Sequence, residues 1–349
     1  MKKIFIIDLE AVPSRYTIQW KTGIPRALEQ EATWRRLSST TLWNFDPEQG
    51  SLPDDTDVTI LPIEGEQITG ETTKGAFLNF SATNVYKSSQ IIKMSKMINR
   101  GLVERGDKIL VTDAWNPGVI QLRYMLELLG ISAEIHSIWH AGSYDPWDFL
   151  GRLIDDKRWS YNFEESLIHA CHKNYFATDF HIGLLLSKLA PDMSNEELDQ
   201  KVIRSGQPHN ELIQTLEPYA TMEKENIILF PHRIAPEKQP EIFRDLEAAL
   251  PEYKFVICQE HSLTKSEYHD LLSRAKIVFS ANLQETLGIS AMEAVLVNTW
   301  PLVPARLSYR EMYEPDFLYP SDYTSSWENY QKLKPSLINK IHTIMQSYD

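Results

Sequence analysis

Arg233 and Lys238 have side chains and a spacing that suit the binding of a phosphate ester. They lie in "LFPHRIAPEKQPEIF" (229–243), which we expect to be a loop between a buried strand and a helix. A guanidinium offers a planar fork to phosphate oxygens, and an ammonium adds a mobile point charge. An Arg-x4-Lys spacing alone is a weak signal, because two cations in a loop usually face water.

The stretch "KIVFSANLQETLGISAMEAVLV" (276–297) has the pattern of a strand, a loop and a helix. The backbone N–H groups of Thr286, Leu287 and Gly288 would be unpaired donors at the start of that helix, where a phosphate can bind. A glycine at 288 would let the backbone approach an anion closely. We therefore expect a diphosphate to lie between this loop and the Arg/Lys pair.

Two glutamates in the same stretch, Glu285 and Glu293, can accept hydrogen bonds from hydroxyl groups. Glu293 lies about one and a half turns into the expected helix, where its carboxylate could accept from both hydroxyls of a ribose. Glu285 precedes the helix and could reach a second sugar. The structural alternative is a helix with one solvated edge. The position of both glutamates after the Arg/Lys loop favours a sugar-nucleotide site.

This order of residues resembles the retaining GT-B glycosyltransferases of glycosyltransferase family 4. The resemblance covers residues 226–311 and is looser in the N-terminal half. In that family the Arg and the Lys bind the donor diphosphate, the first Glu contacts the transferred sugar, and the second binds the nucleotide ribose. The resemblance implies these roles for the four residues named above, and retaining transfer from a nucleotide sugar, with a UDP-sugar favoured. Because the cations and the backbone N–H groups would stabilise the leaving diphosphate, we expect no cofactor and no metal ion.

The chain departs from the family pattern in three places. Asn298 stands where the family usually has glycine, and Tyr309 stands near positions that usually hold small residues. Both departures are expected to reshape the donor pocket without carrying chemistry. The glycine-rich loop that the family has after its first strand is missing, which leaves the N-terminal contacts to donor and acceptor open.

Short apolar, β-branched runs alternate with helical patterns along the chain, which indicates an α/β fold with parallel sheets. With the resemblance, the expected fold is GT-B: two doubly wound, Rossmann-like domains that face each other across a cleft. We expect an acceptor-side domain over 1–190, a linker over 191–225, a nucleotide-sugar-binding domain over 226–325, and a helix over 326–349 that packs back on the body. The expected strands span 3–8, 108–113, 133–140, 174–179, 226–231, 254–259 and 276–281, and the expected helices span 86–104, 117–130, 163–172, 239–250, 264–274 and 327–345.

Residues at the ends of the N-terminal strands are candidates for the acceptor side, because ligands bind at the C-terminal ends of parallel strands. His140 ends a strand in "IWHAGSYDP". The family often has a histidine near this point that contacts the transferred sugar, so we assign His140 and Glu285 as catalytic residues that orient it. The alternative for His140 is a hydrogen-bonded loop histidine. Four more acceptor-side candidates lie at or near strand ends, and the aromatic ones could form a wall for a sugar or a base: Asp113, Trp115, Trp139 and Tyr144.

The motif "HACH" (169–172) hints at a metal site, because it predicts His169 and His172 on one helical face with Cys171 beside them. No other Cys/His set stands at a zinc-like spacing in the sequence. A partly buried helix therefore explains the motif better than a metal centre.

Composition bounds the function further. A length of 349 residues suits two domains of about 150 residues each. Two cysteines predict a reducing, cytoplasmic setting, and no stretch approaches the roughly 18 apolar residues of a membrane span. The net charge of −13 argues against a protein that grips nucleic acid through its whole surface, although it allows a local basic groove.

Segments of the N-terminal half, among them "DLEAVPSRYTIQWKTGIP" and "VTDAWNPGVIQLRYMLELLG", resemble glycosyltransferases encoded by tailed bacteriophages. This resemblance implies an acceptor in phage DNA, the hydroxymethyl group of 5-hydroxymethylcytosine, and action in the host cytoplasm. A saccharide, lipid or protein acceptor, a nucleotide-sugar epimerase of the same fold, and a non-catalytic nucleotide-sugar-binding protein are the alternatives. The cations expected to contact duplex DNA are Arg15, Lys21, Lys87, Lys93 and Arg100. The last three belong to a positive stretch over 87–105, for which a solvated helix face is the structural alternative.

Overall fold

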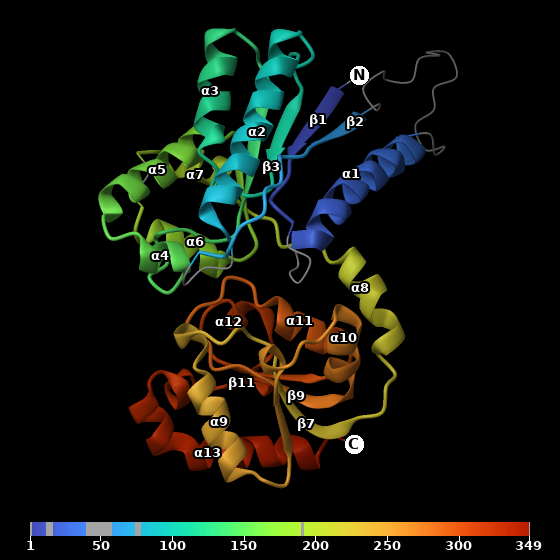
Figure 1. Ribbon diagram of the computed structural model, residues 1–349, viewed down its shortest axis with the longest axis vertical. Coiled ribbons are helices and arrows are strands. Elements are labelled where there is room, and N and C mark those ends of the chain that lie inside the picture. Colours follow the sequence, from blue (N-terminus) through green and yellow to red (C-terminus); the bar gives the residue numbers. More distant parts are fainter. Residues whose placement is uncertain (1, 12–16, 40–57, 74–77, 190–191, 349) are drawn as a thin grey trace. The chain divides into compact units, whose positions relative to one another are not determined.

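The computed structural model describes residues 2–11, 17–39, 58–73, 78–189 and 192–348, and Figure 1 traces their helices and strands. The chain divides into two compact units. The first comprises Met1–Ala177 and Ile182–Pro208, and the second comprises Thr178–His181 and His209–Asp349. Each unit is built on a parallel β-sheet of its own.

The described part of the first unit contains a six-stranded parallel sheet in the order β2-β1-β3-β4-β5-β6. Its central strands are apolar runs such as "KKIFII" and "KILV". Parallel strands that are covered on both faces require such runs, because neither face meets water. The strands are β1 (Lys2–Ile7), β2 (Val58–Ile63), β3 (Lys108–Val111), β4 (Glu134–Trp139), β5 (Lys173–Phe176) and β6 (Val202–Arg204).

Helices pack on both faces of this sheet. Helix α1 packs on one face, where Trp20 and Ile24 meet Ile6. Helices α2, α3 and α5 pack on the other face, where Phe5 and Ile7 point. The alternation of Phe5, Ile6 and Ile7 between the faces follows from the two-residue period of a strand. The helices are α1 (Thr17–Ser39), α2 (Phe80–Asn99), α3 (Gly118–Leu128), α4 (Phe149–Leu153), α5 (Lys157–Ala170), α6 (Asp179–Leu186) and α7 (Asn195–Lys201).

The second unit has a parallel sheet in the order β11-β10-β9-β7-β8, with helices on both faces. Helices α9 and α13 pack on one face, and α8, α10 and α11 pack on the other. The strands are β7 (Glu225–Phe230), β8 (Lys254–Ile257), β9 (Ala275–Phe279), β10 (Trp300–Pro304) and β11 (Leu318–Tyr319). The helices are α8 (Asn210–Leu216), α9 (Pro240–Ala249), α10 (Lys265–Arg274), α11 (Ile289–Leu296), α12 (Tyr309–Met312) and α13 (Trp327–Gln346).

The expected α/β class with parallel sheets is confirmed, and each expected strand and helix has a counterpart. Helix α2 begins at Phe80, six residues before the expected start at 86, because the side chain of Asn79 caps it by accepting from the Ala82 N–H. The expected linker over 191–225 is partly folded into the two units. It supplies α7 and β6 to the first unit and α8 to the second.

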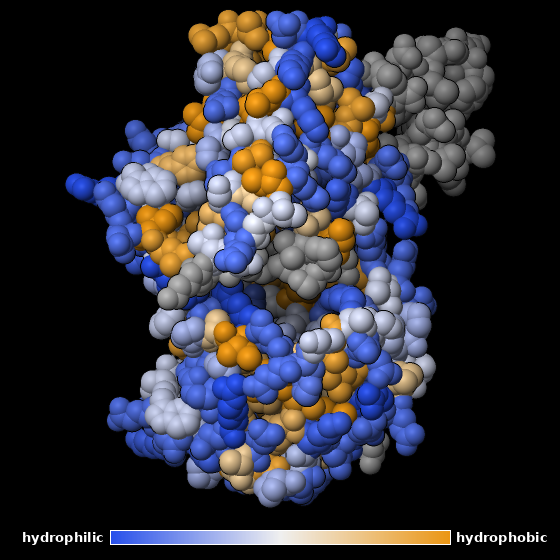
Figure 2. Space-filling model, viewed as in Figure 1, coloured by the Kyte–Doolittle hydropathy of each residue, from blue (hydrophilic) through white to orange (hydrophobic). Residues whose placement is uncertain are grey.

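Surface polarity agrees with the composition. On the face drawn in Figure 2, apolar side chains are scattered among hydrophilic ones. Among the described residues, no helix combines the length and the apolar character needed to cross a membrane.

Candidate functional site

The loop after β7 holds Arg233 and Lys238 on buried partners. Arg233 Nε donates to Glu237 Oε1 at 2.9 Å, and the Glu237 side chain is fully buried. Lys238 ends a short 3₁₀ turn, and its Nζ donates to the Gln284 carbonyl at 2.5 Å. Each cation of the predicted pair therefore contacts an acceptor that the sequence did not single out. A charge of opposite sign four residues after Arg233 was the only signal for Glu237.

Glu285 lies directly against this cationic loop. Its Oε2 is 3.3 Å from Lys238 Nζ and accepts from Asn282 Nδ2 at the same distance. Asn282 also donates to the hydroxyl of Tyr309 at 3.1 Å, and Tyr309 is fully buried. Burial, followed by the nearby Glu285 charge, raises the pKa of Tyr309 well above its ordinary value, so that this hydroxyl stays protonated.

Helix α11 begins as expected, with Gly288 as its N-cap in the left-handed region at φ 88°. A Cβ on Gly288 would lie 2.7 Å from the Tyr309 ring, so both the backbone angle and the space require glycine here. In the part of the chain that the structure describes, the N–H groups of Leu287 and Gly288 have no acceptor. Such donors at the start of a helix suit an anion.

Glu293 lies on α11 with both carboxylate oxygens engaged. Oε1 is 3.1 Å from Lys265 Nζ, and Oε2 accepts from the Tyr268 hydroxyl at 2.7 Å. Lys265 and Tyr268 belong to α10, so the carboxylate ties the two helices together. The Lys265 side chain is 42% exposed, whereas Tyr268 is half-buried. Burial, and then the Glu293 charge, raise the pKa of Tyr268 well above its ordinary value.

A half-buried guanidinium, which no local sequence pattern indicated, fixes the loop that precedes α11. Arg306 donates to the carbonyls of Asn282 at 2.7 Å and Ala281 at 2.8 Å, and to the Ser321 carbonyl at 2.8 Å. Burial lowers the pKa of Arg306 from its ordinary value. The loop is therefore held by a side chain on the next strand–loop unit, which positions Glu285 and the backbone donors.

Two of the three departures from the family pattern, Asn298 and Tyr309, have structural explanations. Asn298 adopts φ 55°, a left-handed angle for which asparagine is the usual substitute for glycine, and its side chain donates to the Ala220 carbonyl at 2.9 Å. The turn is therefore preserved. Tyr309 lies against Gly288, so the larger side chain fills space beside the loop that precedes α11.

In the first unit, His140 and Asp113 lie at the ends of the neighbouring strands β4 and β3. His140 Nε2 is 2.8 Å from the Thr112 carbonyl, and its ring centroid is 4.7 Å from that of Trp20. Burial would raise the pKa of Asp113, but the Lys87 ammonium at 2.7 Å, with a smaller contribution from His140, holds that pKa below its ordinary value. The two predicted residues are thus brought together at the C-terminal edge of this sheet.

The expected aromatic wall is wrong for two of its three members. Trp139 is buried, stacks on Phe176 with ring centroids 5.6 Å apart, and donates to Asn174 at 2.9 Å. Tyr144 is fully buried as well. Both belong to the hydrophobic core of the first unit. Trp115 is half-buried, and its indole N–H donates to Glu164 at 2.8 Å.

The helical prediction for "HACH" is also wrong. Helix α5 ends at Ala170, and His172 lies beyond it, where its Nδ1 accepts from the Ile135 N–H at 3.0 Å. His169 and His172 therefore do not share a helical face. Within the described ranges, no cluster of three or more His, Cys, Asp or Glu side chains is arranged to hold a metal ion.

Most of the expected DNA-contacting cations have other partners or lie outside the described residues. Lys87 binds Asp113 and the Trp115 carbonyl, each at 2.7 Å. Lys21 pairs with Glu64 at 2.8 Å. Arg15 lies outside the residues that the structure describes. Lys93 and Arg100 line a common depression with Lys96.

No family model matches this chain. The catalytic domain of starch synthase IV from Arabidopsis thaliana, bound to ADP and acarbose, is 11% identical, with a TM-score of 0.55 over 99% of this chain and 94% of that one. Sucrose-phosphate synthase from Thermosynechococcus elongatus is 12% identical, with a TM-score of 0.55 over 100% of this chain and 95% of that one. The pneumococcal O-GlcNAc transferase GtfA, in complex with UDP and GlcNAc, is 14% identical, with a TM-score of 0.49. That match covers 75% of this chain and only 54% of GtfA, so this chain spans about half of GtfA's length. The two matches over nearly the full length give this chain the GT-B fold of nucleotide-sugar glycosyltransferases.

Proposed function

We propose that this chain is a retaining glycosyltransferase that takes its sugar from a nucleotide sugar, with a UDP-sugar as the favoured donor. The observation that carries the proposal is the convergence of Lys238, Glu285 and the start of α11 in the second unit. It supplies a cation, backbone N–H donors and a carboxylate within one loop system. A nucleoside diphosphate with a sugar attached needs these groups in this combination.

The bond between the anomeric carbon and the diphosphate breaks as negative charge grows on the leaving group. Arg233, Lys238 and the N–H groups of Leu287 and Gly288 would stabilise that charge, because they are fixed before the reaction. The acceptor oxygen would bond to the anomeric carbon from the face that the diphosphate leaves, and its proton would pass to the leaving phosphate oxygen. Glu285 would orient the sugar. Because the acceptor attacks from the face that the diphosphate leaves, no covalent enzyme intermediate is needed.

Glu293 would bind the ribose of the nucleotide. Its carboxylate already accepts from Tyr268 and pairs with Lys265. Because Lys265 is the more exposed of the two partners, we expect the ribose hydroxyls to displace its ammonium and to leave the Tyr268 bond in place.

For the acceptor we propose the hydroxymethyl group of 5-hydroxymethylcytosine in duplex DNA. The support is the resemblance of the N-terminal segments to phage glycosyltransferases. A base inside a duplex cannot present this group to a buried anomeric carbon, so the enzyme would flip the base or bend the duplex, at a cost of a few kcal/mol. Trp115, half-buried beside Asp113, is a stacking surface for an extruded base.

The experiment that tests the function has two stages. A thermal-shift screen over UDP-, GDP- and ADP-sugars identifies the donor. The purified chain is then incubated with that donor and a duplex containing 5-hydroxymethylcytosine, and the digested nucleosides are analysed by mass spectrometry. We expect a nucleoside that is heavier by one sugar residue. Transfer only to a saccharide, lipid or protein would refute the DNA acceptor and keep the donor site, and conversion of the donor alone into an epimer would refute transfer.

A further inference from the structure

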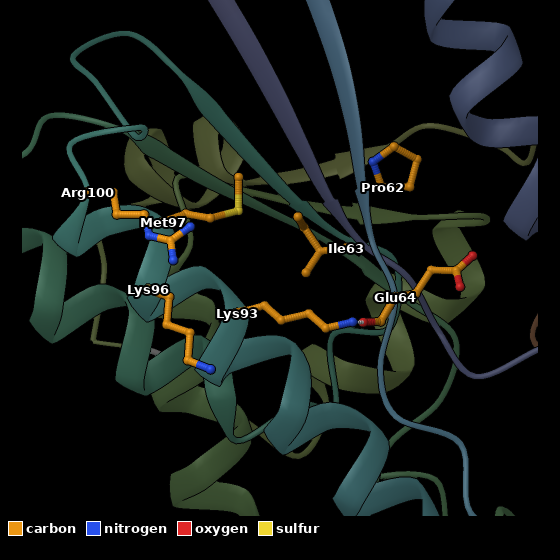
Figure 3. A pocket seen from close by; sticks show the side chains of 7 residues that line it. All are labelled: Pro62, Ile63, Glu64, Lys93, Lys96, Met97 and Arg100. Atoms are coloured by element: carbon orange, nitrogen blue, oxygen red, sulfur yellow. Dashed lines mark hydrogen bonds between the residues drawn. The ribbon is translucent and has the colours of Figure 1, made fainter.

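A depression of about 470 Å³ lies on the first unit, between the end of β2 and helix α2. Figure 3 shows its side chains: Lys93 reaches across to the backbone at Glu64, while Ile63 and Met97 lie between the strand and the helix. The volume is more than ten times the roughly 30 Å³ that one water molecule occupies in the liquid. The depression therefore has room for a group larger than a single ion. Its lining consists of Pro62, Ile63, Glu64, Lys93, Lys96, Met97 and Arg100.

The charge of this depression is positive, although the chain as a whole is acidic. Lys93 Nζ donates to the Glu64 carbonyl at 2.6 Å, and the Glu64 carboxylate pairs with Lys21 at 2.8 Å. The hydrogen bond from Lys21 and the charge of Lys21 lower the pKa of Glu64. Glu64 is thus neutralised by a lysine outside the depression. Among the described residues, the side chains of Lys96 and Arg100 have no hydrogen-bond or ion-pair partner.

The three cations form one row along the last turns of α2, with Arg100 at its C-cap. Lys93, Lys96 and Arg100 recur at the three- and four-residue spacing of a helix face, with axial separations of about 4.5 and 6 Å. The sequence of α2 contains no acidic residue that could pair with them. Like charges four residues apart destabilise a helix by a few tenths of a kcal/mol. Anions bound along the row would remove this repulsion.

We propose that this depression binds consecutive backbone phosphates of a nucleic-acid acceptor, an identification that rests on the proposed function. Because the cations form a row and do not converge on one point, they match a chain of phosphates better than a single phosphate ion. The apolar floor of Ile63 and Met97 suits the deoxyribose carbons between phosphates. The acceptor strand would therefore contact the first unit along α2, through contacts that position it without reading its sequence.

The test uses the double variant K96Q/R100Q and a charge-matched control, R26Q/K188Q, whose residues are exposed elsewhere on the first unit. Lys93 is kept, because its bond to Glu64 supports the strand. Binding of a fluorescent 20-base-pair duplex is measured by anisotropy from 50 to 200 mM salt. Three phosphate contacts predict that wild-type affinity falls about 40-fold over this range, and that of K96Q/R100Q only about fourfold. The control should behave as the wild type.

Equal salt dependence in the wild type and in K96Q/R100Q would overturn the proposal. A second outcome would also overturn it: the duplex does not bind, inorganic pyrophosphate does, and K96Q/R100Q abolishes pyrophosphate binding. The depression would then be a site for a small anion. Calorimetry with UDP on the same proteins separates the two proposals. Absence of UDP binding in the wild type refutes the donor site and leaves the duplex titration valid. Intact UDP binding in K96Q/R100Q with weakened duplex binding supports both.

Discussion

Lys238 and Glu285 form an ion pair, with the ammonium Nζ 3.3 Å from the carboxylate Oε2, that joins the loop after β7 to the loop before α11. The two side chains are only 8% and 19% exposed. Each charge is therefore poorly hydrated, and removing one partner would leave the other nearly buried without its counter-charge. We expect an incoming diphosphate to draw the ammonium toward its own oxygens and to release Glu285 for the hydroxyl groups of the sugar. Diphosphate binding and sugar orientation would then be coupled through one pair.

The first prediction concerns Arg233. Arg233→Ala should weaken UDP binding at least tenfold, measured by calorimetry, because it removes one of two cations from the diphosphate. The same change takes the counter-charge from the buried Glu237, which lowers stability as well. The double variant R233M/E237Q avoids this second effect and should show the same loss of affinity with a nearly unchanged melting temperature. Unaltered UDP affinity in both proteins would mean that the diphosphate binds elsewhere.

The second prediction separates the two glutamates. Glu293→Gln should weaken free UDP and UDP-sugar alike, because it removes a ribose contact. Glu285→Gln should spare free UDP and lower the rate of transfer, because it acts on the sugar. Lys265→Met is the control for Glu293, since it breaks the ion pair and leaves the carboxylate. Equal effects of both glutamine variants on free UDP would contradict the assigned roles.

The proximity of the candidate donor-binding residues was predictable, because they follow the order of one strand–loop–helix unit. Arg233, Lys238, Glu285 and Gly288 all lie after β7 or β9, and the ends of parallel strands meet at one edge of a sheet. The side chains that hold them were not predictable. Arg306 contacts the carbonyl of a residue 24 positions earlier, and Tyr268 reaches a carboxylate 25 positions later. Such partners carry no local pattern.

Three of the strands that the sequence did not predict, β6, β10 and β11, and the wrong assignment of Trp139 also have physical causes. β10 contains Pro301 and Pro304, and prolines argue against a strand that has neighbours on both sides. β6 and β11 are three and two residues long, too short to show a period. Trp139 was assigned to a wall because an aromatic residue at a strand end looks the same in sequence whether it faces a ligand or the core.

A third prediction is that transfer does not require a divalent metal. Lys238 and the backbone donors before α11 would supply the positive potential that a metal ion supplies in other transferases. Turnover in 5–10 mM EDTA, roughly the excess needed to strip trace metal, should equal that of the untreated enzyme. If turnover is lost in EDTA and restored by Mn²⁺ or Mg²⁺, a metal ion stabilises the leaving diphosphate, and the prediction is refuted.

The last prediction concerns Asp8, a buried carboxyl group directly after β1. Its Oδ2 has no hydrogen-bond partner among the described residues. Burial raises the pKa of Asp8 to about 7, against the pull of Lys21 on α1, and the charge of Glu64 after β2 adds a smaller upward effect. The folded protein therefore holds this proton more tightly than the unfolded chain does. A carboxyl group of this kind contributes stability that is complete below its unfolded pKa near 3.8 and is lost as pH rises through about 7.

Asp8→Asn should remove this pH dependence, because the amide does not titrate. Between pH 5 and pH 8.5 we expect the variant to gain roughly 3 kcal/mol of unfolding free energy relative to the wild type, since the titration spans about two pKa units and each corresponds to about 1.4 kcal/mol. Urea unfolding at the two pH values measures the difference. Asp155→Asn is a matched control, because Asp155 is an exposed carboxylate in the same unit, and it should show no such gain. An Asp8→Asn variant whose relative stability is the same at both pH values would show that the carboxyl group is hydrated or paired in solution, and that the burial of its Oδ2 is not what sets its pKa.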